Sequence, residues 1–197
     1  MALPGKVLIV GGTQGIGRAL ADALGQDAVV WSRRTGVHAE DPASLAAALA
    51  RDFADAPPFG LVHTIGDFVE RPLLSTVRAD QDHLVSSNLT TLLATVQAVV
   101  PAMAAARRGR VVLFAAAGVE RQRAMTRAPL YFALKAAVAQ IGRSLAAEVA
   151  PQRLTVNVIS PGLIEHPHSH QESQRRMMPR VPLGRLGTAQ DRSEEHT

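Results

Sequence analysis

The 197-residue chain contains no cysteine, which excludes disulfides, thiolate metal sites and a cysteine nucleophile. Aromatic residues make up only 4% of the chain and its arginines are scattered, so no stacking surface for nucleic acid is indicated. No apolar run reaches the roughly 18 residues of a membrane-spanning helix, and the N-terminus lacks the pattern of a signal peptide. The sequence therefore predicts a cytoplasmic protein that binds neither nucleic acid nor a membrane.

Short apolar runs alternate with longer segments that have helical periodicity. The predicted strands are residues 6–10, 28–32, 60–65, 110–115 and 154–159. The predicted helices are residues 15–25, 42–53, 80–106 and 129–150. Asp41 is the predicted N-cap of the second helix, with Pro42 in its first turn. This alternation predicts an α/β fold with a doubly wound parallel sheet, whose ligand site lies beyond the carboxyl ends of the strands.

A glycine cluster separates the first predicted strand from the first predicted helix. The segment reads GGTQGIG and consists of Gly11, Gly12, Thr13, Gln14, Gly15, Ile16 and Gly17. Glycines let the backbone turn sharply and approach a pyrophosphate, and the following helix N-terminus offers free N–H groups and positive potential. A plain tight turn is the alternative, but the strand before the cluster and the helix after it favour a dinucleotide site.

Two arginines follow the second predicted strand, in the sequence Ser32-Arg33-Arg34. In a dinucleotide-binding fold this position faces the adenosine ribose, where an acidic residue binds the 2′-hydroxyl of NAD and an arginine accommodates the 2′-phosphate of NADP. A guanidinium suits a phosphate because its planar fork stays charged and donates two parallel hydrogen bonds. Arg33 therefore predicts a preference for NADP(H), and a solvated loop arginine is the alternative.

Tyr131 and Lys135 are spaced four residues apart on a predicted helix. Tyr131 is the only tyrosine, and Lys135 is one of two lysines. Residues i and i+4 share a helix face, so the ammonium group is expected near the phenol. A nearby cation favours the phenolate and lowers the pKa of a tyrosine, which predicts a general acid–base group that works near neutral pH.

These features together resemble the short-chain dehydrogenase/reductase family, a Rossmann-fold group of NAD(P)-dependent oxidoreductases. Its Y-x-x-x-K motif matches Tyr131 and Lys135, and its T-G-x-x-x-G-x-G motif matches residues 10–17 except that Val10 replaces threonine. The stretch 181–188 is similar to one in 3-oxoacyl-[acyl-carrier-protein] reductases. The resemblance implies a small carbonyl or alcohol substrate, Tyr131 as the proton donor, and Lys135 as the group that tunes it and holds the nicotinamide ribose.

The resemblance also implies further site residues. Asn88 looks like the family's helix asparagine, which positions a relay water. Gly66 is the one residue kept from the family's N-N-A-G sequence, which reads His63-Thr64-Ile65-Gly66 here. Pro161 and Gly162 look like the family's turn on the nicotinamide side.

One departure affects the predicted chemistry directly. Ala116 stands where the family has a catalytic serine, and loss of such a donor typically slows an enzyme by about 10²–10³. Glu120 and Thr126 are unranked candidates to reach the site instead. Three functions therefore stay open: an NADPH-dependent carbonyl reductase or alcohol dehydrogenase, a dinucleotide-binding sensor or inactive partner subunit without turnover, and a dehydratase or epimerase.

The remaining expectations concern assembly and the end of the chain. The helices 80–106 and 129–150 have broad apolar surfaces, and in the family they pair with a second subunit, so a homodimer is expected. His166, His168 and His170 are predicted to belong to a substrate loop rather than a metal site. Residues 1–191 are predicted to form one Rossmann domain that lacks the family's last helix and strand, which would impair a tetramer contact and leave strand 154–159 as an edge. Residues 192–197 resemble a foreign tail.

Overall fold

The computed structural model describes residues 3–121, 123–164, 178–181 and 184–188. Five parallel strands form one sheet in the order β2-β1-β3-β4-β5. Their bounds are β1 (Val7–Val10), β2 (Ala28–Trp31), β3 (Gly60–His63), β4 (Gly109–Phe114) and β5 (Leu154–Ile159). In register, Val10 lies beside Trp31 and His63, and Phe114 lies beside Ile159. The carboxyl ends of the strands therefore meet at one edge of the sheet, as the sequence predicts.

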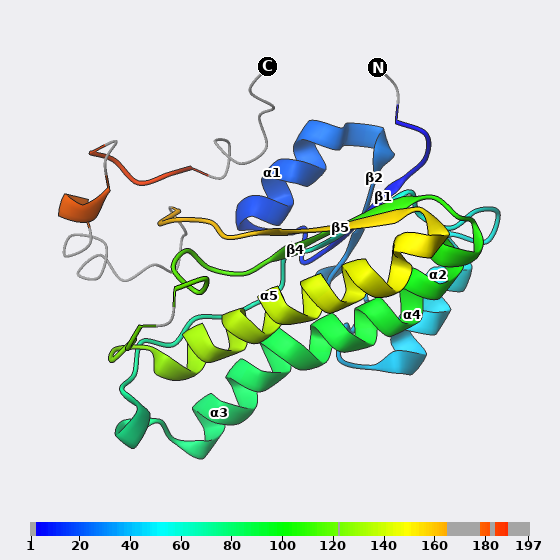
Figure 1. Cartoon of the computed structure of the whole chain (residues 1–197). Helices are drawn as coiled ribbons and strands as arrows, with labels where there is room; N and C mark the ends of the chain where they lie inside the picture. The colour runs from blue at the N-terminus through cyan, green and yellow to red at the C-terminus, as the bar shows by residue number, and fades with distance from the viewer. Residues whose placement is uncertain (1–2, 122, 165–177, 182–183, 189–197) are drawn as a thin grey trace.

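Helices cover both faces of the sheet (Figure 1). Their bounds are α1 (Gly15–Leu24), α2 (Pro42–Asp52), α3 (Arg78–Val85), α4 (Thr91–Ala105) and α5 (Pro129–Val149). On one face α1 packs on a small core that includes Ile9 and Val62. On the other face the larger core contains residues from α2, α4 and α5, such as Leu45, Val99 and Val138. This arrangement is a Rossmann-type doubly wound fold.

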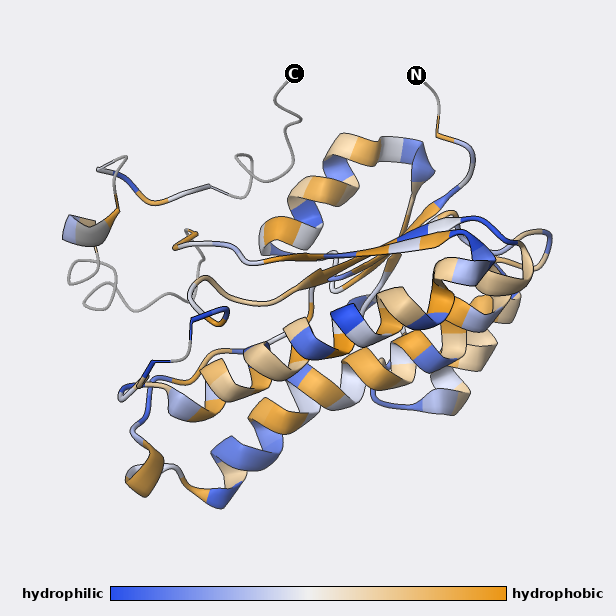
Figure 2. Ribbon diagram, viewed as in Figure 1, coloured by the Kyte–Doolittle hydropathy of each residue, from blue (hydrophilic) through white to orange (hydrophobic). Residues whose placement is uncertain are grey.

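The hydropathy pattern explains why these elements form. In Figure 2 the strands are mostly hydrophobic, whereas the helices alternate hydrophobic and hydrophilic residues, as expected for strands buried on both faces and helices covered on one. The start of α2 agrees with the sequence prediction, because the Asp41 carboxylate accepts a 2.9 Å hydrogen bond from the Ala43 backbone N–H and Pro42 occupies the first turn.

The predicted helix 80–106 differs from the observed one. The helical run begins at Arg78, and a π-helical turn at Ser86–Thr90 separates α3 from α4. By length and composition alone the run Arg78–Ala105 would suffice to cross a membrane. Its side chains Leu92, Val99 and Met103 are buried in the core on the sheet, so one face of this run packs against the sheet.

The end of β3 and the position of β5 can be compared with the sequence predictions. Strand β3 ends at His63 rather than at Ile65, and Thr64 leaves the ladder while its backbone N–H and its hydroxyl both donate to the Val10 carbonyl oxygen. Strand β5 lies at the sheet edge in the described part of the chain, and Ile159 is 37% exposed. The histidines at 166, 168 and 170 and the tail 192–197 lie outside the described residues.

Candidate active site

The glycine loop after β1 is a cradle that side chains would block. Gly11 has φ +96°, and a methyl group there would lie 2.7 Å from the Thr64 hydroxyl oxygen. A methyl group at Gly17 would lie 2.7 Å from the Gly11 carbonyl oxygen and 2.6 Å from the same hydroxyl. The loop can therefore fold tightly against β3 only with glycine at both positions. This close packing brings the N-terminus of α1 to the carboxyl edge of the sheet, where a pyrophosphate fits.

A hollow of about 410 Å³ opens beside this loop, and among its lining residues are Gly12, Thr13, Arg18 and Arg34. The predicted phosphate ligand Arg33 does not line it. Arg33 is exposed and lies 3.8 Å from a carboxylate oxygen of Glu40. Both arginines belong to a short helical turn after β2 that the Ser32 side chain caps. The structure thus adds Arg34 as a second candidate for the ribose phosphate, because its side chain faces the glycine loop.

Tyr131 lies in the first turn of α5, and Lys135 lies one turn later. The Tyr131 ring contacts the Phe68 ring edge to face, with centroids 4.9 Å apart. The Lys135 ammonium is 5.8 Å from the centroid of the Tyr131 ring. It donates a 3.0 Å hydrogen bond to the carbonyl oxygen of Phe114, the last residue of β4. The two side chains therefore lie one turn apart on the same helix, as predicted from their spacing, and the Lys135 hydrogen bond places this part of α5 beside the carboxyl end of β4.

The predicted effect of Lys135 on Tyr131 is wrong for the chain alone. Burial raises the pKa of Tyr131 to about 12, because a phenolate loses more solvation than a phenol when it is buried. Burial also lowers the pKa of Lys135 to about 8, against a smaller raising effect of Asp67. Burial is therefore the cause of the raised pKa, and Tyr131 is a protonated phenol at neutral pH.

Asn88 lies in the π-helical turn, 1% exposed. Its side-chain N–H groups donate to the carbonyl oxygens of Leu84 at 3.0 Å and Asp67 at 3.1 Å. Its oxygen Oδ1 is buried without a hydrogen-bond partner. A methyl group on Gly66 would lie 2.7 Å from this oxygen and 2.6 Å from Lys135 Nζ. The structure therefore brings together Asn88, Gly66 and Lys135, which the sequence analysis had selected separately.

His63 is a buried member of this neighbourhood that the sequence analysis treated only as a departure from a family motif. It is 4% exposed, and burial together with the nearby Lys135 charge lowers its pKa to about 3. In the described residues the buried polar side chains are those of His63, Ser87, Asn88, Thr91, Thr95 and Lys135. They come from the end of β3, from the start of α4 with the preceding turn, and from α5. The sequence signal that could have identified His63 is a polar residue at the end of an otherwise apolar strand.

Ala116 is 8% exposed and offers no hydroxyl group. The segment after β4 continues beside β5, because the backbone N–H groups of Ala115 and Ala117 donate to the carbonyl oxygens of Ile159 and Pro161. This pairing brings Pro161, and with it the predicted Pro161-Gly162 turn, to the same edge of the sheet.

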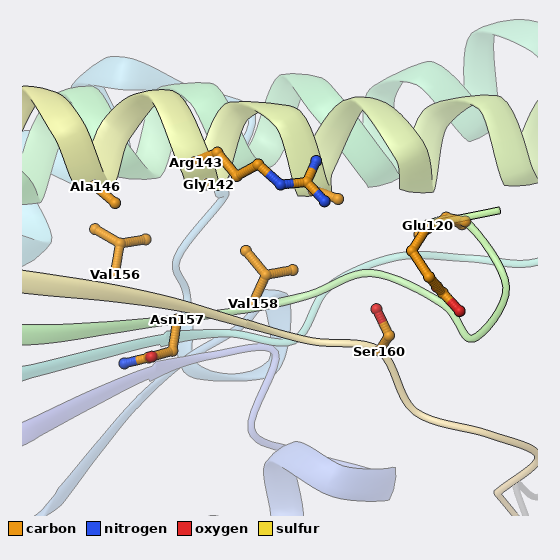
Figure 3. Close-up of a pocket in the computed structure, with 10 residues that line it drawn as sticks. Glu120, Gly142, Arg143, Ala146, Val156, Asn157, Val158 and Ser160 are labelled. Atoms are coloured by element: carbon orange, nitrogen blue, oxygen red, sulfur yellow. The ribbon is translucent and has the colours of Figure 1, made fainter. Parts of the chain in front are cut away.

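Glu120 and Thr126, the two candidates to replace the serine, lie in the loop between β4 and α5. The Glu120 carboxylate accepts a 3.1 Å hydrogen bond from the Gly118 backbone N–H. It also lines a groove of about 280 Å³ between α5 and β5, with Arg143 and Ser160 (Figure 3). Glu120 is therefore held on the β5 side of its loop. Thr126 lies in the same loop, shortly before α5, and is exposed.

Comparison with known proteins agrees with this geometry. A family model described as Enoyl-(Acyl carrier protein) reductase matches residues 13–194. The chain is 30% identical to the 3-oxoacyl-[acyl-carrier-protein] reductase FabG of Escherichia coli (strain K12), over 97% of this chain and 88% of that protein. It is 28% identical to a sorbitol dehydrogenase of Cereibacter sphaeroides, with the same coverage.

The structural comparison identifies the same group of enzymes. A 3-oxoacyl-[acyl-carrier protein] reductase with bound NAD from Brucella melitensis superposes with a TM-score of 0.81 at 25% identity, covering 96% of this chain and 81% of that one. The parallel sheet, the glycine loop and the family match together show that the chain belongs to the short-chain dehydrogenase/reductase family of oxidoreductases and has its NAD(P)-binding Rossmann fold.

Proposed function

We propose that the chain is an NADPH-dependent carbonyl reductase that also works in reverse as an alcohol dehydrogenase. In the reductive direction a ketone or aldehyde, NADPH and one proton give an alcohol and NADP⁺. The cofactor, when bound, supplies the hydride to the carbonyl carbon. Tyr131 donates the proton to the carbonyl oxygen.

The observation that carries this proposal is the cluster at the carboxyl ends of β3 and β4. Lys135 Nζ and the unpartnered Asn88 Oδ1 both face Gly66, one helical turn from Tyr131. Because the pKa of Tyr131 is raised to about 12, its phenol holds the proton that a reduction consumes. Lys135 is largely protonated at pH 7, since its pKa is about 8, and it re-supplies a proton through a water that Asn88 positions.

The residues of the glycine loop suit a dinucleotide. Gly11, Gly15 and Gly17 keep the loop backbone free of side chains, and Thr13, Gln14 and Ile16 complete the turn into α1. Gly66, Pro161 and Gly162 belong to the nicotinamide side of the same edge. Arg33 and Arg34 follow β2 and favour the 2′-phosphate of NADP(H) over the hydroxyl of NAD(H).

We further propose that the protein is a cytoplasmic homodimer. Val85 and Leu93 on the α3–α4 run are 40% and 41% exposed. Contact between these large apolar side chains and water is unfavourable. A second copy packed against α4 and α5 would cover them.

The test is a screen of ketones and aldehydes with saturating NADPH, with Tyr131→Phe as the comparison. The variant keeps the ring contact with Phe68 but loses the acidic hydroxyl. Turnover should fall by about 10²–10⁴ while NADPH binding and the melting temperature stay unchanged. Wild-type NADPH consumption no faster than that of the variant, for every substrate, would disprove the proposed reduction.

The second candidate is an NADP(H)-binding protein without turnover, a sensor or an inactive partner subunit. Ala116 favours it, because the site lacks the hydroxyl that would help hold a substrate carbonyl. Ala116→Ser separates the two functions. A slow reductase should gain about 10-fold or more in turnover with the added donor. Tight NADPH binding with no consumption, and no gain in the serine variant, would support the sensor.

A further inference from the structure

His63 is a buried titratable side chain that the proposed mechanism does not use. On β3, Leu61 belongs to the large core and Val62 to the small core, so His63 points to the same face of the sheet as Leu61. The large core on that face also contains residues of α4 and α5. His63 is 4% exposed, and in the described part of the chain its ring atom Nε2 is buried without a hydrogen-bond partner. One nitrogen of a buried imidazole is therefore unsatisfied on the helix-covered face.

Lys135 is the charged neighbour of this ring. In the sheet register His63 is paired with Leu113 on β4, and the next residue, Phe114, accepts the 3.0 Å hydrogen bond from Lys135 Nζ. Since neighbouring strands lie about 4.8 Å apart, the ammonium group is held close to the strand partner of His63. Burial and, after it, the Lys135 charge lower the pKa of His63 to about 3. At neutral pH a neutral imidazole acceptor therefore lies near an ammonium with three N–H groups.

Thr91 and Thr95 lie one turn apart on α4 and are both buried, at 2% and 0% exposure. The Thr91 hydroxyl donates a 2.9 Å hydrogen bond to the Ser87 carbonyl oxygen, a common bond for a threonine inside a helix. Thr95 Oγ1 has no such partner among the residues that the structure describes. The Thr91 backbone, whose carbonyl group faces residue 95 in the helix, is hydrogen-bonded to the His63 ring. The unsatisfied Thr95 hydroxyl therefore belongs to the turn of α4 that the imidazole contacts.

Buried side-chain atoms without a hydrogen-bond partner gather around these groups. Within the described ranges they are His63 Nε2, Asn88 Oδ1, Thr95 Oγ1 and Asp80 Oδ2. Asp80 Oδ2 is 2.7 Å from Arg71 Nε, so an ion pair compensates it. The other three belong to the end of β3 and to the adjoining helical run. Buried polar atoms are rarely left unsatisfied, and an internal water with about three polar partners is a common way to satisfy them.

We propose that His63 and Thr95 bind an internal water that extends the relay of Lys135 and Asn88 into the protein interior, and that His63 is thereby a positioning residue for Lys135. The water donates to His63 Nε2, shares a hydrogen bond with Thr95 Oγ1 and accepts from the ammonium side of the relay. A neutral imidazole suits this position, because a second cation would be repelled by Lys135. The role in turnover rests on the proposed reductase function, whereas the water site does not.

Lys135 can be followed directly, because the chain has only two lysines. In the full chain, with lysine carbon-13 labelled at Cε, a pH titration by NMR gives one signal for Lys135 and one for Lys6. Lys6 precedes β1, at the opposite end of the sheet, and serves as the internal reference. Lys135 should titrate about 1 pH unit lower in His63→Leu, and also lower in Thr95→Val, because its ammonium loses the stabilisation that the water supplies.

Thr91→Val is the matched control, because this hydroxyl is equally buried on the same helix but already bonded to a backbone carbonyl. It should leave the Lys135 titration unchanged. His63→Gln keeps a side-chain acceptor and should restore most of the wild-type behaviour. Asp67, which raises the pKa of Lys135 and pairs with His83 at 3.1 Å, is the same in every variant. An unchanged Lys135 titration in His63→Leu, or an equal change in Thr91→Val, overturns the water site.

Kinetics separate a positioning role from a structural one. With a ketone and NADPH, His63→Leu should lower kcat about 10-fold and move the alkaline limb of the kcat–pH profile down with the Lys135 titration, while KM for the ketone stays unchanged. The melting temperature should not fall, since leucine needs no hydrogen-bond partner in a buried place. If Lys135 titrates as expected and no variant reduces any ketone, the water site stands and the reductase proposal fails. If the titration moves but the kcat–pH profile does not, His63 is not a positioning residue.

Discussion

The two ends of the carboxyl edge of the sheet are built by different means. Around β1 and α1 the backbone forms the site, and Gly11 and Gly17 are required because any Cβ would strike Thr64 or the loop itself. Around the ends of β3 and β4 individual side chains form it, and Lys135, Asn88 and His63 are polar groups held in the interior. The first end depends on the absence of side chains. The second depends on polar side chains that cost stability where they lie, and it is there that Ala116 departs from the family pattern.

Lys135→Met should have the largest effect on the side-chain part of the site. Turnover should fall about 10²–10⁴-fold, because Tyr131 loses its neighbouring cation and proton source. Stability should rise by at most about 3 kcal/mol at pH 7, since the folded pKa is about 8 and that of an unfolded lysine is 10.5. Between those values the unfolded chain binds the extra proton, so the wild type gains stability as the pH rises from 8 to 10.5.

Urea unfolding of both proteins at pH 7 and pH 10 measures this effect. The stability advantage of Lys135→Met should shrink at the higher pH. An equal advantage at both values would mean that Lys135 is not destabilised by its burial.

Gly17→Ala should damage the other end of the edge. The added methyl group meets the Gly11 carbonyl oxygen, a backbone atom that cannot rotate away. We expect a loss of about 2–3 kcal/mol in stability and of about 30- to 100-fold in NADPH affinity. Gly25→Ala is the control, because Gly25 has open space around it and its φ of +54° makes the added methyl group a test of backbone strain alone. Similar losses of NADPH affinity in both variants would show that backbone strain, and not the cradle, controls binding.

His63→Asn should reduce the loss of stability at low pH. The pKa of His63 is about 3 in the folded chain and 6.5 when unfolded, so the unfolded chain binds the proton first as the pH falls. The wild type therefore loses stability between pH 6.5 and 3, by roughly 3 kcal/mol at pH 4 from this group. The variant should lose that much less between pH 7 and pH 4 in urea unfolding. An unchanged acid sensitivity would assign the loss to carboxylates elsewhere.

Arg33→Ala and Arg34→Ala should have the smallest effects, because both side chains lie near solvent. Arg34 lines the hollow beside Gly12 and Thr13, whereas Arg33 lies near Glu40. We expect Arg34→Ala to weaken NADPH binding about 10-fold without changing NADH binding, and Arg33→Ala to have a lesser effect. Fluorescence titration with both cofactors measures this. Equal NADPH and NADH affinities in the wild type would remove the proposed preference.

Local sequence signals were sufficient wherever neighbouring residues decide the structure. The apolar runs located all five observed strands within two residues, and Asp41-Pro42 located the start of α2, because burial periodicity and capping are short-range effects. The i, i+4 spacing placed Tyr131 and Lys135 on one face for the same reason. The π-helical turn at Ser86–Thr90 was missed, since the surrounding residues continue an ordinary helical pattern.

The amino-acid pattern specifies the succession of strands and helices, the glycine loop and the residue types available for proton transfer. The orientation and protonation of those groups depend on the folded structure. It turned Asn88 Oδ1 and Lys135 Nζ toward Gly66, buried His63 beside them, and raised the pKa of Tyr131 that the sequence had predicted to fall. A pKa depends on how much solvent the whole fold removes from a group, and segments distant in the sequence supply that burial.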